Sequence, residues 1–292
     1  MGSKLLDGII KDRHNSANLK IVFVDVVSYS RRRSLTQAQV VENFMTVLEE
    51  ARADVARLYL TYAEANGVNF KEDIIFIPSG DGAAICFPFE GLHDVHLNFA
   101  KSLLSATEAR NQATPCAKFE QQGWCNCHAN FKLAVGISDG KAIIYRDVNK
   151  NYNVAGNAMN LAARVMAEAD GGQILFTEEA YTNIIDLVGD SHLDEKFVLH
   201  PDVRIKNGKI NIYQYIDSSL DYLNGNPPAD IAMSTRARNA MSAISGMFPL
   251  PVMPEDGPGP AELEKMVQAI EVVGKALNDL NLPKIIDQKS RG

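Results

Sequence analysis

The stretch KIVFVDVV (residues 20–27) decides the fold, because it is a run of β-branched residues too short to form a helix. We interpret it as a buried central strand. It carries one carboxylate, Asp25, and an isolated ionised carboxylate in a protein core loses several kcal/mol of hydration. Asp25 therefore needs a compensating partner.

A second carboxylate, Asp81, lies in SGDG between the apolar runs DIIFIP (73–78) and AAICF (83–87). This pattern predicts a hairpin with Asp81 at its tip. If the hairpin pairs with the 20–27 strand, the two carboxylates repel each other and one pKa rises unless a cation lies between them. Two Mg²⁺ or Mn²⁺ ions would suit such oxygen ligands and a phosphoryl displacement. The alternative is that Asp81 only caps the turn.

The remaining pattern predicts a ferredoxin-like α+β domain with an antiparallel-type central sheet and flanking helices. A lead-in at residues 1–17 precedes the domain at 18–217, and a turn-rich appendage at 218–292 contains a helix at about 261–280. We expect helices from near Thr36 to Gly67 and at 91–111, 153–169 and 177–188, an irregular insertion at about 112–130, and strands at 131–138, 141–145, 171–177, 197–200, 203–205 and 209–216. The strands at 131–138 and 141–145 are expected to pair around a turn at Asp139-Gly140.

The composition argues against a nucleic-acid or membrane binder. The net charge of the 292 residues is −7, whereas nucleic acids and anionic membranes select basic surfaces. No run approaches the roughly 20 apolar residues that span a bilayer, and the N-terminus lacks a signal-sequence pattern. We therefore expect a cytoplasmic protein without membrane insertion, and we place the triplet Arg31–Arg33 on a solvent-facing turn.

Three of the four cysteines cluster with a histidine in TPCAKFEQQGWCNCHAN. Cys116, Cys125, Cys127 and His128 are residue types that bind zinc, but Cys-x-Cys-His lacks the usual Cys-x2-Cys spacing. Unligated thiols in an insertion are the default interpretation, and a structural metal is the alternative.

Asn160 and Arg164 are four residues apart in NLAAR, so they project from one helix face and can address one ligand. With this pair, four motifs resemble the class III nucleotidyl cyclases, over about residues 18–216. The motifs are FVDVVSYS (23–30), SGDG (79–82), NVAGNAMNLAAR (153–164) and VRIKNGKINIYQY (203–215).

The resemblance implies an antiparallel homodimer with two shared active sites. Asp25, Val26 and Asp81 of one subunit would form the metal site for two divalent cations. From the other subunit, Asn160 would orient the ribose and Arg164 would neutralise charge on the α-phosphate while pyrophosphate leaves.

The same resemblance implies how the triphosphate is held. Lys206 would contact it, although Lys209 can take this role because the hairpin is one residue shorter than the family pattern. Lys141 would be a second cation. Backbone N–H groups from Val26 to Ser30, including those of Ser28 and Tyr29, would cradle phosphate oxygens.

The base pocket departs from both purine patterns of the family. Adenylyl cyclases place a Lys four residues before the second metal Asp and an Asp seven before the Asn, and guanylyl cyclases use Glu and Cys; here these positions are Ile77 and Asn153. A purine edge facing Ile77 would leave polar atoms unpaired, at about 1–3 kcal/mol each. One amide suits a pyrimidine, and flipping it fits uracil or cytosine. Asn153 as a mere turn residue is the alternative.

The chain thus most resembles the Pycsar pyrimidine cyclases of bacterial anti-phage defence. We expect a cyclase that converts UTP, in preference to CTP, to the cyclic monophosphate, which a separate effector protein would detect. The alternatives are an adenylyl cyclase with a divergent base pocket and a cyclase-like module that only binds a nucleotide. Asp25, Asp81, Asn160 and Arg164 together disfavour the binding-only module, which has no chemical need for all four.

Overall fold

The computed structural model describes residues 3–12, 15–127, 129–206 and 208–233. The chain divides into two compact units, Met1–Pro228 and Ala229–Gly292. The first unit carries all the features discussed below. The helix expected at about 261–280 lies outside the described residues.

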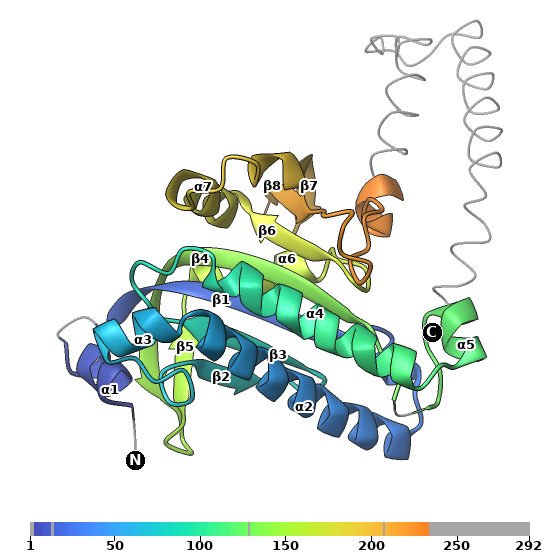
Figure 1. Cartoon of the computed structure of the whole chain (residues 1–292), viewed down its shortest axis with the longest axis horizontal. Coiled ribbons are helices and arrows are strands. Elements are labelled where there is room, and N and C mark those ends of the chain that lie inside the picture. Colours follow the sequence, from blue (N-terminus) through green and yellow to red (C-terminus); the bar gives the residue numbers. More distant parts are fainter. Residues whose placement is uncertain (1–2, 13–14, 128, 207, 234–292) are drawn as a thin grey trace, which may run out of the picture. The chain divides into compact units, whose positions relative to one another are not determined.

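An eight-stranded sheet forms the first unit, in the order β2-β3-β1-β4-β6-β8-β7 with β5 paired to β4 (Figure 1). Neighbouring strands are antiparallel except β4 and β6, which are parallel. The strands are β1 Ser16–Val26, β2 Ile75–Pro78, β3 Gly82–Phe87, β4 Leu133–Arg146, β5 Tyr152–Ala155, β6 Ile174–Thr177, β7 Phe197–Ile205 and β8 Gly208–Tyr215. The predicted central position of the 20–27 strand is correct.

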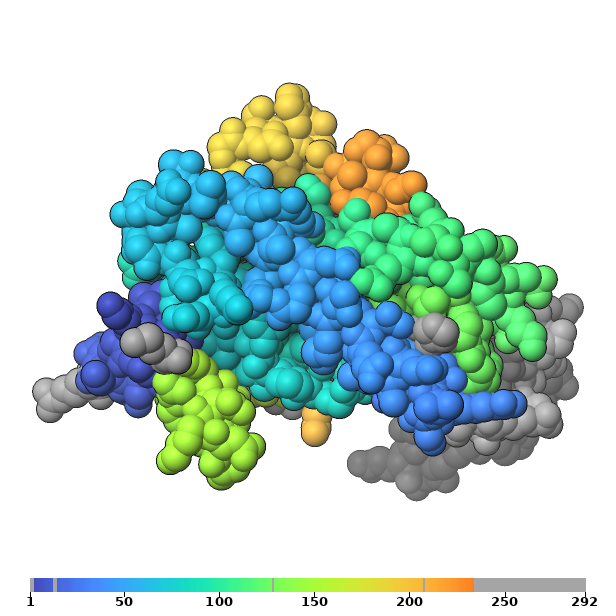
Figure 2. Space-filling view, turned by 60° about the horizontal axis from the view of Figure 1, so that its bottom comes forward, coloured from blue at the N-terminus to red at the C-terminus, as the bar shows by residue number. Residues whose placement is uncertain are grey.

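The helices of the described residues flank this sheet, which confirms the predicted α+β class. They are α1 Lys4–Lys11, α2 Ser34–Leu58, α3 Leu60–Asn66, α4 Val95–Ala113, α5 Ala117–Gln122, α6 Asn157–Met166 and α7 Glu178–Leu187, with short 3-10 turns at Tyr29–Arg31 and Asp194–Lys196. Figure 2 shows α2 (blue) lying beside α4 (green) on one side of the molecule.

Alternation along β1 builds a separate core on each face of the sheet, because successive strand residues point to opposite faces. Val22, Val24 and Val26 are buried in the core that contains α2 and α4. Leu19 and Ile21 are buried in the smaller core that contains α1 and α6. Asp25 follows the odd-numbered alternation, so it lies on the α6 face.

The close contact of α6 with the sheet depends on Gly136 in β4. A Cβ atom at Gly136 would lie 2.3 Å from the Met166 backbone nitrogen and 2.4 Å from the Ala162 backbone oxygen. Because only glycine lacks that atom, this position fixes how near α6 approaches β4. Ala158, Ala162 and Val165 form the buried side of the helix.

The predicted turn at Asp139-Gly140 is wrong, because β4 runs unbroken through both residues. Asp139 and Gly140 pair with Lys20 and Leu19 of β1. The Asp139 carboxylate is buried 3.1 Å from His96 Nε2 and accepts a hydrogen bond from Asn183. An Asp-Gly pair favours a turn when no neighbouring strand pairs with it. Here β1 runs alongside both residues and pairs with them, so the chain stays extended.

Other local expectations also change. The helix predicted from Thr36 to Gly67 is interrupted at Tyr59, which separates α2 from α3. The insertion at 112–130 contains α5, and the lead-in contains α1. The strands expected at 197–200 and 203–205 are one strand, β7, with a bulge.

Residues 217–226, directly after β8, pack on the sheet. The Asn224 N–H donates to Gly172 O at 2.8 Å, and the Gln214 amide donates to the carbonyls of Asn224 and Asn226. Leu220, Tyr222 and Leu223 contact the larger core.

Candidate active site

Asp25 and Asp81 lie side by side at one end of the sheet, as the sequence predicts. Antiparallel pairing of β1 with β3 puts Asp25 opposite Gly82, the residue after Asp81. A Cβ at Gly82 would lie 2.4 Å from Val24 O and 2.7 Å from an Asp25 carboxylate oxygen, so glycine is required for this close approach. The hairpin is closed by the Ser79 N–H, which donates to Gly82 O at 2.9 Å.

The surroundings of the pair disfavour the ionised form of Asp25. Burial and the negative charge of Asp81 raise the pKa of Asp25 to about 6, and a hydrogen bond from the Val26 backbone only partly opposes this rise. The arrangement therefore destabilises the doubly ionised state. A divalent cation such as Mg²⁺ or Mn²⁺ prefers oxygen ligands, and it would offset the repulsion between the Asp25 and Asp81 carboxylates.

Asn160 and Arg164 lie on α6, which begins after Gly156. Asn160 is exposed and Arg164 is half-buried, while the other side of the helix packs on the sheet. The four-residue spacing places them on one helix face, as the sequence predicts. Because α6 covers the face to which Asp25 points, all three residues lie on the same side of the sheet.

The chain leaves β1 through an unusual backbone conformation. Ser28 has a φ of 58°, in the left-handed region that residues with side chains seldom adopt, and Tyr29–Arg31 form a 3-10 turn. The Val27 N–H donates to Lys132 O at 3.0 Å, so it is not available to the phosphate cradle expected at Val26 to Ser30. Of the N–H groups expected to bind phosphate, that of Val27 is therefore already used within the fold.

Ile77 and Asn153 line one pocket of about 370 Å³, although they lie 76 positions apart in the sequence. Ile77 comes from β2 and Asn153 from β5, and Pro78 and Tyr152 also line the pocket. The Val154 backbone N–H donates to the Asn153 carboxamide oxygen at 2.8 Å. The amide group of Asn153 is thus oriented with its oxygen toward its own backbone.

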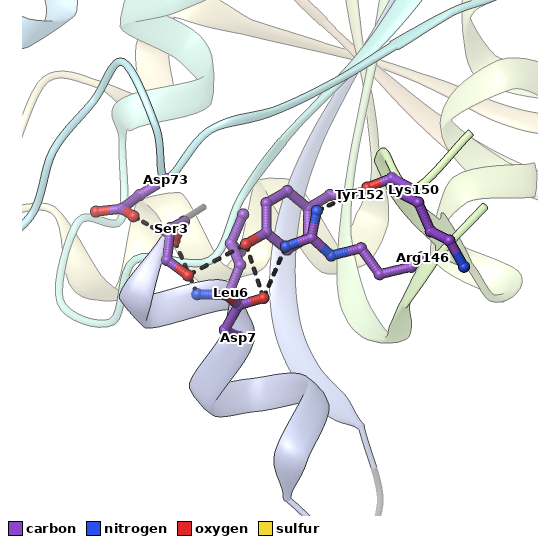
Figure 3. A network of polar contacts seen from close by, with 7 residues as sticks. All are labelled: Ser3, Leu6, Asp7, Asp73, Arg146, Lys150 and Tyr152. Atoms are coloured by element: carbon purple, nitrogen blue, oxygen red, sulfur yellow. Dashed lines mark hydrogen bonds and ion pairs between the residues drawn. The ribbon is translucent and has the colours of Figure 1, made fainter. Parts of the chain in front are cut away.

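The N-terminal helix α1 holds the two walls of this pocket together (Figure 3). The Asp7 carboxylate accepts hydrogen bonds from Arg146 at 2.7 Å and from Tyr152 at 2.9 Å, and the Arg146 guanidinium stacks on the Tyr152 ring. At the other wall, the Ser3 hydroxyl donates to Asp73, just before β2. Figure 2 shows the β4–β5 tip (yellow-green) beside α1 (dark blue).

Sequence reasoning missed this network, although a signal for α1 was present. Ser3 caps the helix by accepting a hydrogen bond from the Leu6 N–H, and Leu6, Ile9 and Ile10 recur at helical spacing. The partners Arg146 and Tyr152 are more than 130 residues away, so no local pattern pointed to them.

The three lysines considered for the triphosphate lie on other elements than the aspartate pair. Lys141 is exposed on β4, and Lys206 is exposed in the turn between β7 and β8. Lys209, at the start of β8, lines a pocket of about 400 Å³ with Leu161 of α6, but three carboxylates line it too: Glu178, Glu179 and Asp202. That acidic lining makes this pocket a poor triphosphate site.

Among the described residues, no helix combines the length and the apolar character needed to cross a bilayer.

The burial of the arginine triplet Arg31–Arg33 differs in part from the expectation of a solvent-facing turn. Arg32 is buried, whereas Arg31 and Arg33 are exposed as predicted.

Comparison with known proteins places these features in context. A family model described as "Adenylate and Guanylate cyclase catalytic domain" matches residues 12–216. The chain is 34% identical over 80 residues to a receptor-type adenylate cyclase of Trypanosoma congolense, which is 27% of this chain and 11% of that protein. It is 35% identical over 68 residues to receptor-type adenylate cyclase A of Leishmania donovani, which is 23% of this chain and 5% of that protein. The matches thus span a small part of these relatives.

A bacterial light-regulated adenylyl cyclase has a similar structure, with a TM-score of 0.52 and 13% sequence identity. The similarity covers 78% of this chain and 59% of that one. At this identity the likeness concerns the fold alone.

Proposed function

The chain belongs to the family of adenylate and guanylate cyclase catalytic domains, and we propose that it cyclises a pyrimidine nucleoside triphosphate. In this reaction the ribose 3′ oxygen bonds to the α-phosphorus, the bond from that phosphorus to the bridging oxygen breaks, and pyrophosphate leaves. The 3′ hydroxyl proton passes to solvent. The products are the 3′,5′-cyclic monophosphate and pyrophosphate.

The observation that carries the proposal is the proximity of Asp25 and Asp81, because β1 pairs with β3 so that Asp25 lies opposite Gly82, the residue after Asp81. Cyclases of this family use divalent metal ions, and these two carboxylates with the Val26 backbone would hold two of them, as Mg²⁺ or Mn²⁺. Bound cations would neutralise the triphosphate and acidify the ribose hydroxyl. The raised pKa of Asp25 supports this role, because the paired carboxylates are unfavourable without a cation.

Asn160 would orient the ribose, and Arg164 would neutralise charge on the α-phosphate as the leaving group departs. The backbone at Ser28 and Tyr29 would bind phosphate oxygens. Lys206 would be the main cation for the triphosphate, and Lys141 the second; Lys209 is less suited because acidic side chains line its pocket.

We propose that two copies of the chain share their active sites. Phe23 and Ile77 are only partly buried on the α6 face of the sheet, near the residues assigned to catalysis. A second copy would cover this apolar surface and bring its Asn160 and Arg164 to the aspartate pair of the first. Mixing Asp81→Ala with Arg164→Ala subunits should restore part of the activity if the sites are shared, whereas confirmed heterodimers without activity would place each site within one chain.

The shared pocket of Ile77 and Asn153 supports a pyrimidine substrate. Ile77 offers no hydrogen bond, so the extra polar atoms of a purine edge would lose about 1–3 kcal/mol each. A single amide satisfies the smaller number of polar groups on one edge of a pyrimidine.

UTP is favoured over CTP because the Asn153 oxygen already accepts from the Val154 N–H. With its oxygen engaged in this bond, Asn153 would offer its NH2 group to the base, where it would donate to uracil O4. Cytosine has an amino group at this ring position, and two donors facing each other cannot form a hydrogen bond. CTP would therefore have to shift so that its N3 acceptor faces the Asn153 NH2 group.

The cyclic pyrimidine nucleotide would act as a second messenger in anti-phage defence, read by a separate effector protein. The lack of both purine patterns at Ile77 and Asn153, as in the Pycsar cyclases, is the support for this role. An adenylyl cyclase is the second candidate, because the curated relatives that match are named receptor-type adenylate cyclases.

The test is to incubate the purified chain with ATP, GTP, CTP or UTP, with Mn²⁺ and then Mg²⁺, and to identify the products by chromatography and mass. Cyclic UMP as the main product is expected. Cyclic AMP alone would keep the catalytic assignment and refute the pocket argument. Product formation by Asp25→Ala or Asp81→Ala at the wild-type rate would refute the metal site. No product, with nucleotide binding retained, would favour a binding-only module.

A further inference from the structure

A cluster of three cysteine sulfurs lies away from the aspartate pair, beside the start of α2. The sulfur atoms of Cys116, Cys125 and Cys127 all lie within 4.8 Å of one another, and Cys125 is buried. Cys125 and Cys127 are joined by a disulfide bond, while Cys116 is a free thiol. A disulfide thus accounts for only two of three sulfurs that the fold has brought together.

Arg32 provides an independent observation about the same place. Its side chain is 4% exposed, and its Nη1 donates to Cys125 O at 2.9 Å and to Cys127 O at 3.1 Å. Its Nε and Nη2 are buried and have no hydrogen-bond partner among the described residues. No ion pair found among those residues includes it.

A buried guanidinium without an anion is costly, and the two hydrogen bonds of Nη1 compensate only part of the lost hydration. The Cys125–Cys127 disulfide carries no charge and leaves this cost in place. Three thiolates around one Zn²⁺ carry one net negative charge, which would balance Arg32. Zn–S bonds of about 2.3 Å in a tetrahedron place the sulfurs just under 4 Å apart. Zinc binding would therefore require reduction of the disulfide and separation of the Cys125 and Cys127 sulfurs, whereas all three sulfurs already lie within 4.8 Å of one another.

We propose that Cys116, Cys125 and Cys127, as reduced thiolates, bind one Zn²⁺ ion, with Arg32 as the cation that balances the site. The three thiolates leave one tetrahedral position for a further ligand. His128, considered with these cysteines on sequence grounds, lies outside the described residues. The disulfide is the alternative, oxidised state of two of the same sulfurs.

The zinc site would hold the loop that precedes β4 against the loop that follows β1. The Arg33 N–H donates to the Asn126 side chain at 2.9 Å, and the Thr36 hydroxyl donates to Asn126 O at 3.3 Å. The Val27 N–H donates to Lys132 O a few residues further on. The ion would therefore brace the segment next to Asp25 without taking part in the reaction.

The first test measures zinc in the full chain, purified with reductant and then desalted. We expect about one zinc per chain, retained in Asp25→Asn and in Cys86→Ser, whose thiol is buried in β3 away from the cluster. Cys116→Ser should lose the ion. Zinc retained by Cys116→Ser, or absent from the reduced wild-type chain, would overturn the proposal.

A second test uses only the wild-type chain, so it does not depend on a variant folding. The protein is denatured with a chelator but without reductant, and its free thiols are alkylated and counted by mass. All four cysteines should react if the chain carried zinc, whereas the disulfide would leave only Cys86 and Cys116 reactive and would argue against the site.

The role of Arg32 is tested with its exposed neighbour as the matched control. Arg32→Gln should weaken Zn²⁺ binding by about 10–100-fold in competition with a chromogenic chelator, as for other groups adjacent to metal ligands. Arg33→Gln should leave the affinity unchanged. Equal Zn²⁺ affinities in the two variants would show that Arg32 does not contribute to zinc binding.

Discussion

Replacing Asp25 by Asn should stabilise the metal-free protein, and more so at high pH. In the folded chain, burial and Asp81 raise the pKa of Asp25 from 3.8 to about 6. The folded state therefore binds this proton more tightly than the unfolded state does. Stability contributed by that proton is present at low pH and is lost as the pH rises through 6. Asn carries no charge, so the variant avoids the loss.

The magnitude follows from the same shift. A rise of roughly two pKa units lowers the folding stability of the wild type by about 3 kcal/mol once the Asp25 carboxylate is fully ionised. About half of this loss has already occurred at pH 5. The advantage of Asp25→Asn over the wild type should therefore grow by about 1.4 kcal/mol from pH 5 to pH 8. For a unit of this size, that is a widening of the Tm difference by about 3–6 °C.

The assay is thermal unfolding of the full chain at both pH values with a chelator present, and Asp186→Asn on the exposed side of α7 is the matched control. Adding Mn²⁺ at pH 8 should raise the Tm of the wild type and not that of Asp25→Asn, because only the folded wild-type pair binds the ion. The reasoning fails if the difference in Tm between Asp25→Asn and wild type is the same at pH 5 and pH 8.

Three further outcomes are expected. Arg164→Ala should lower kcat by about 10²–10³-fold with a smaller change in KM, and a change in KM alone would remove its transition-state role. Gly136→Ala should cost several kcal/mol in unfolding free energy, because its Cβ would lie 2.3 Å from the α6 backbone, whereas Gly189→Ala, with open space around it, should change the Tm little. Tyr152→Phe, which removes the hydroxyl bonded to Asp7, should lower stability in chemical denaturation by about 1 kcal/mol; an unchanged midpoint would show that α1 is held by other contacts.

The strands that position the aspartate pair were predictable because each is a local pattern. The 20–27 run and the hairpin around SGDG specify strands through neighbouring residues, and the placement of Asp81 at the tip follows from the turn. The α6 spacing of Asn160 and Arg164 is local in the same sense. Their catalytic roles remain predictions that rest on the family.

Several features were misjudged because distant segments decide them. The Asp139-Gly140 pair was interpreted as a turn, but β1 continues past it and supplies strand partners. Arg32 was placed on a solvent-facing turn, but the loop at Cys125–Cys127 folds over it.

The sequence by itself determined the α+β class, the strand that carries Asp25 and the hairpin that carries Asp81, because hydrophobic periodicity and turn residues act over a few positions. Tertiary structure alone decided which side chains line the same pocket, form hydrogen bonds with each other or cluster together. Ile77 meets Asn153, Asp7 meets Tyr152 and Cys116 meets Cys125 only after strands and loops from distant parts of the chain pack together. Such meetings depend on the three-dimensional path of the chain, which no local pattern encodes.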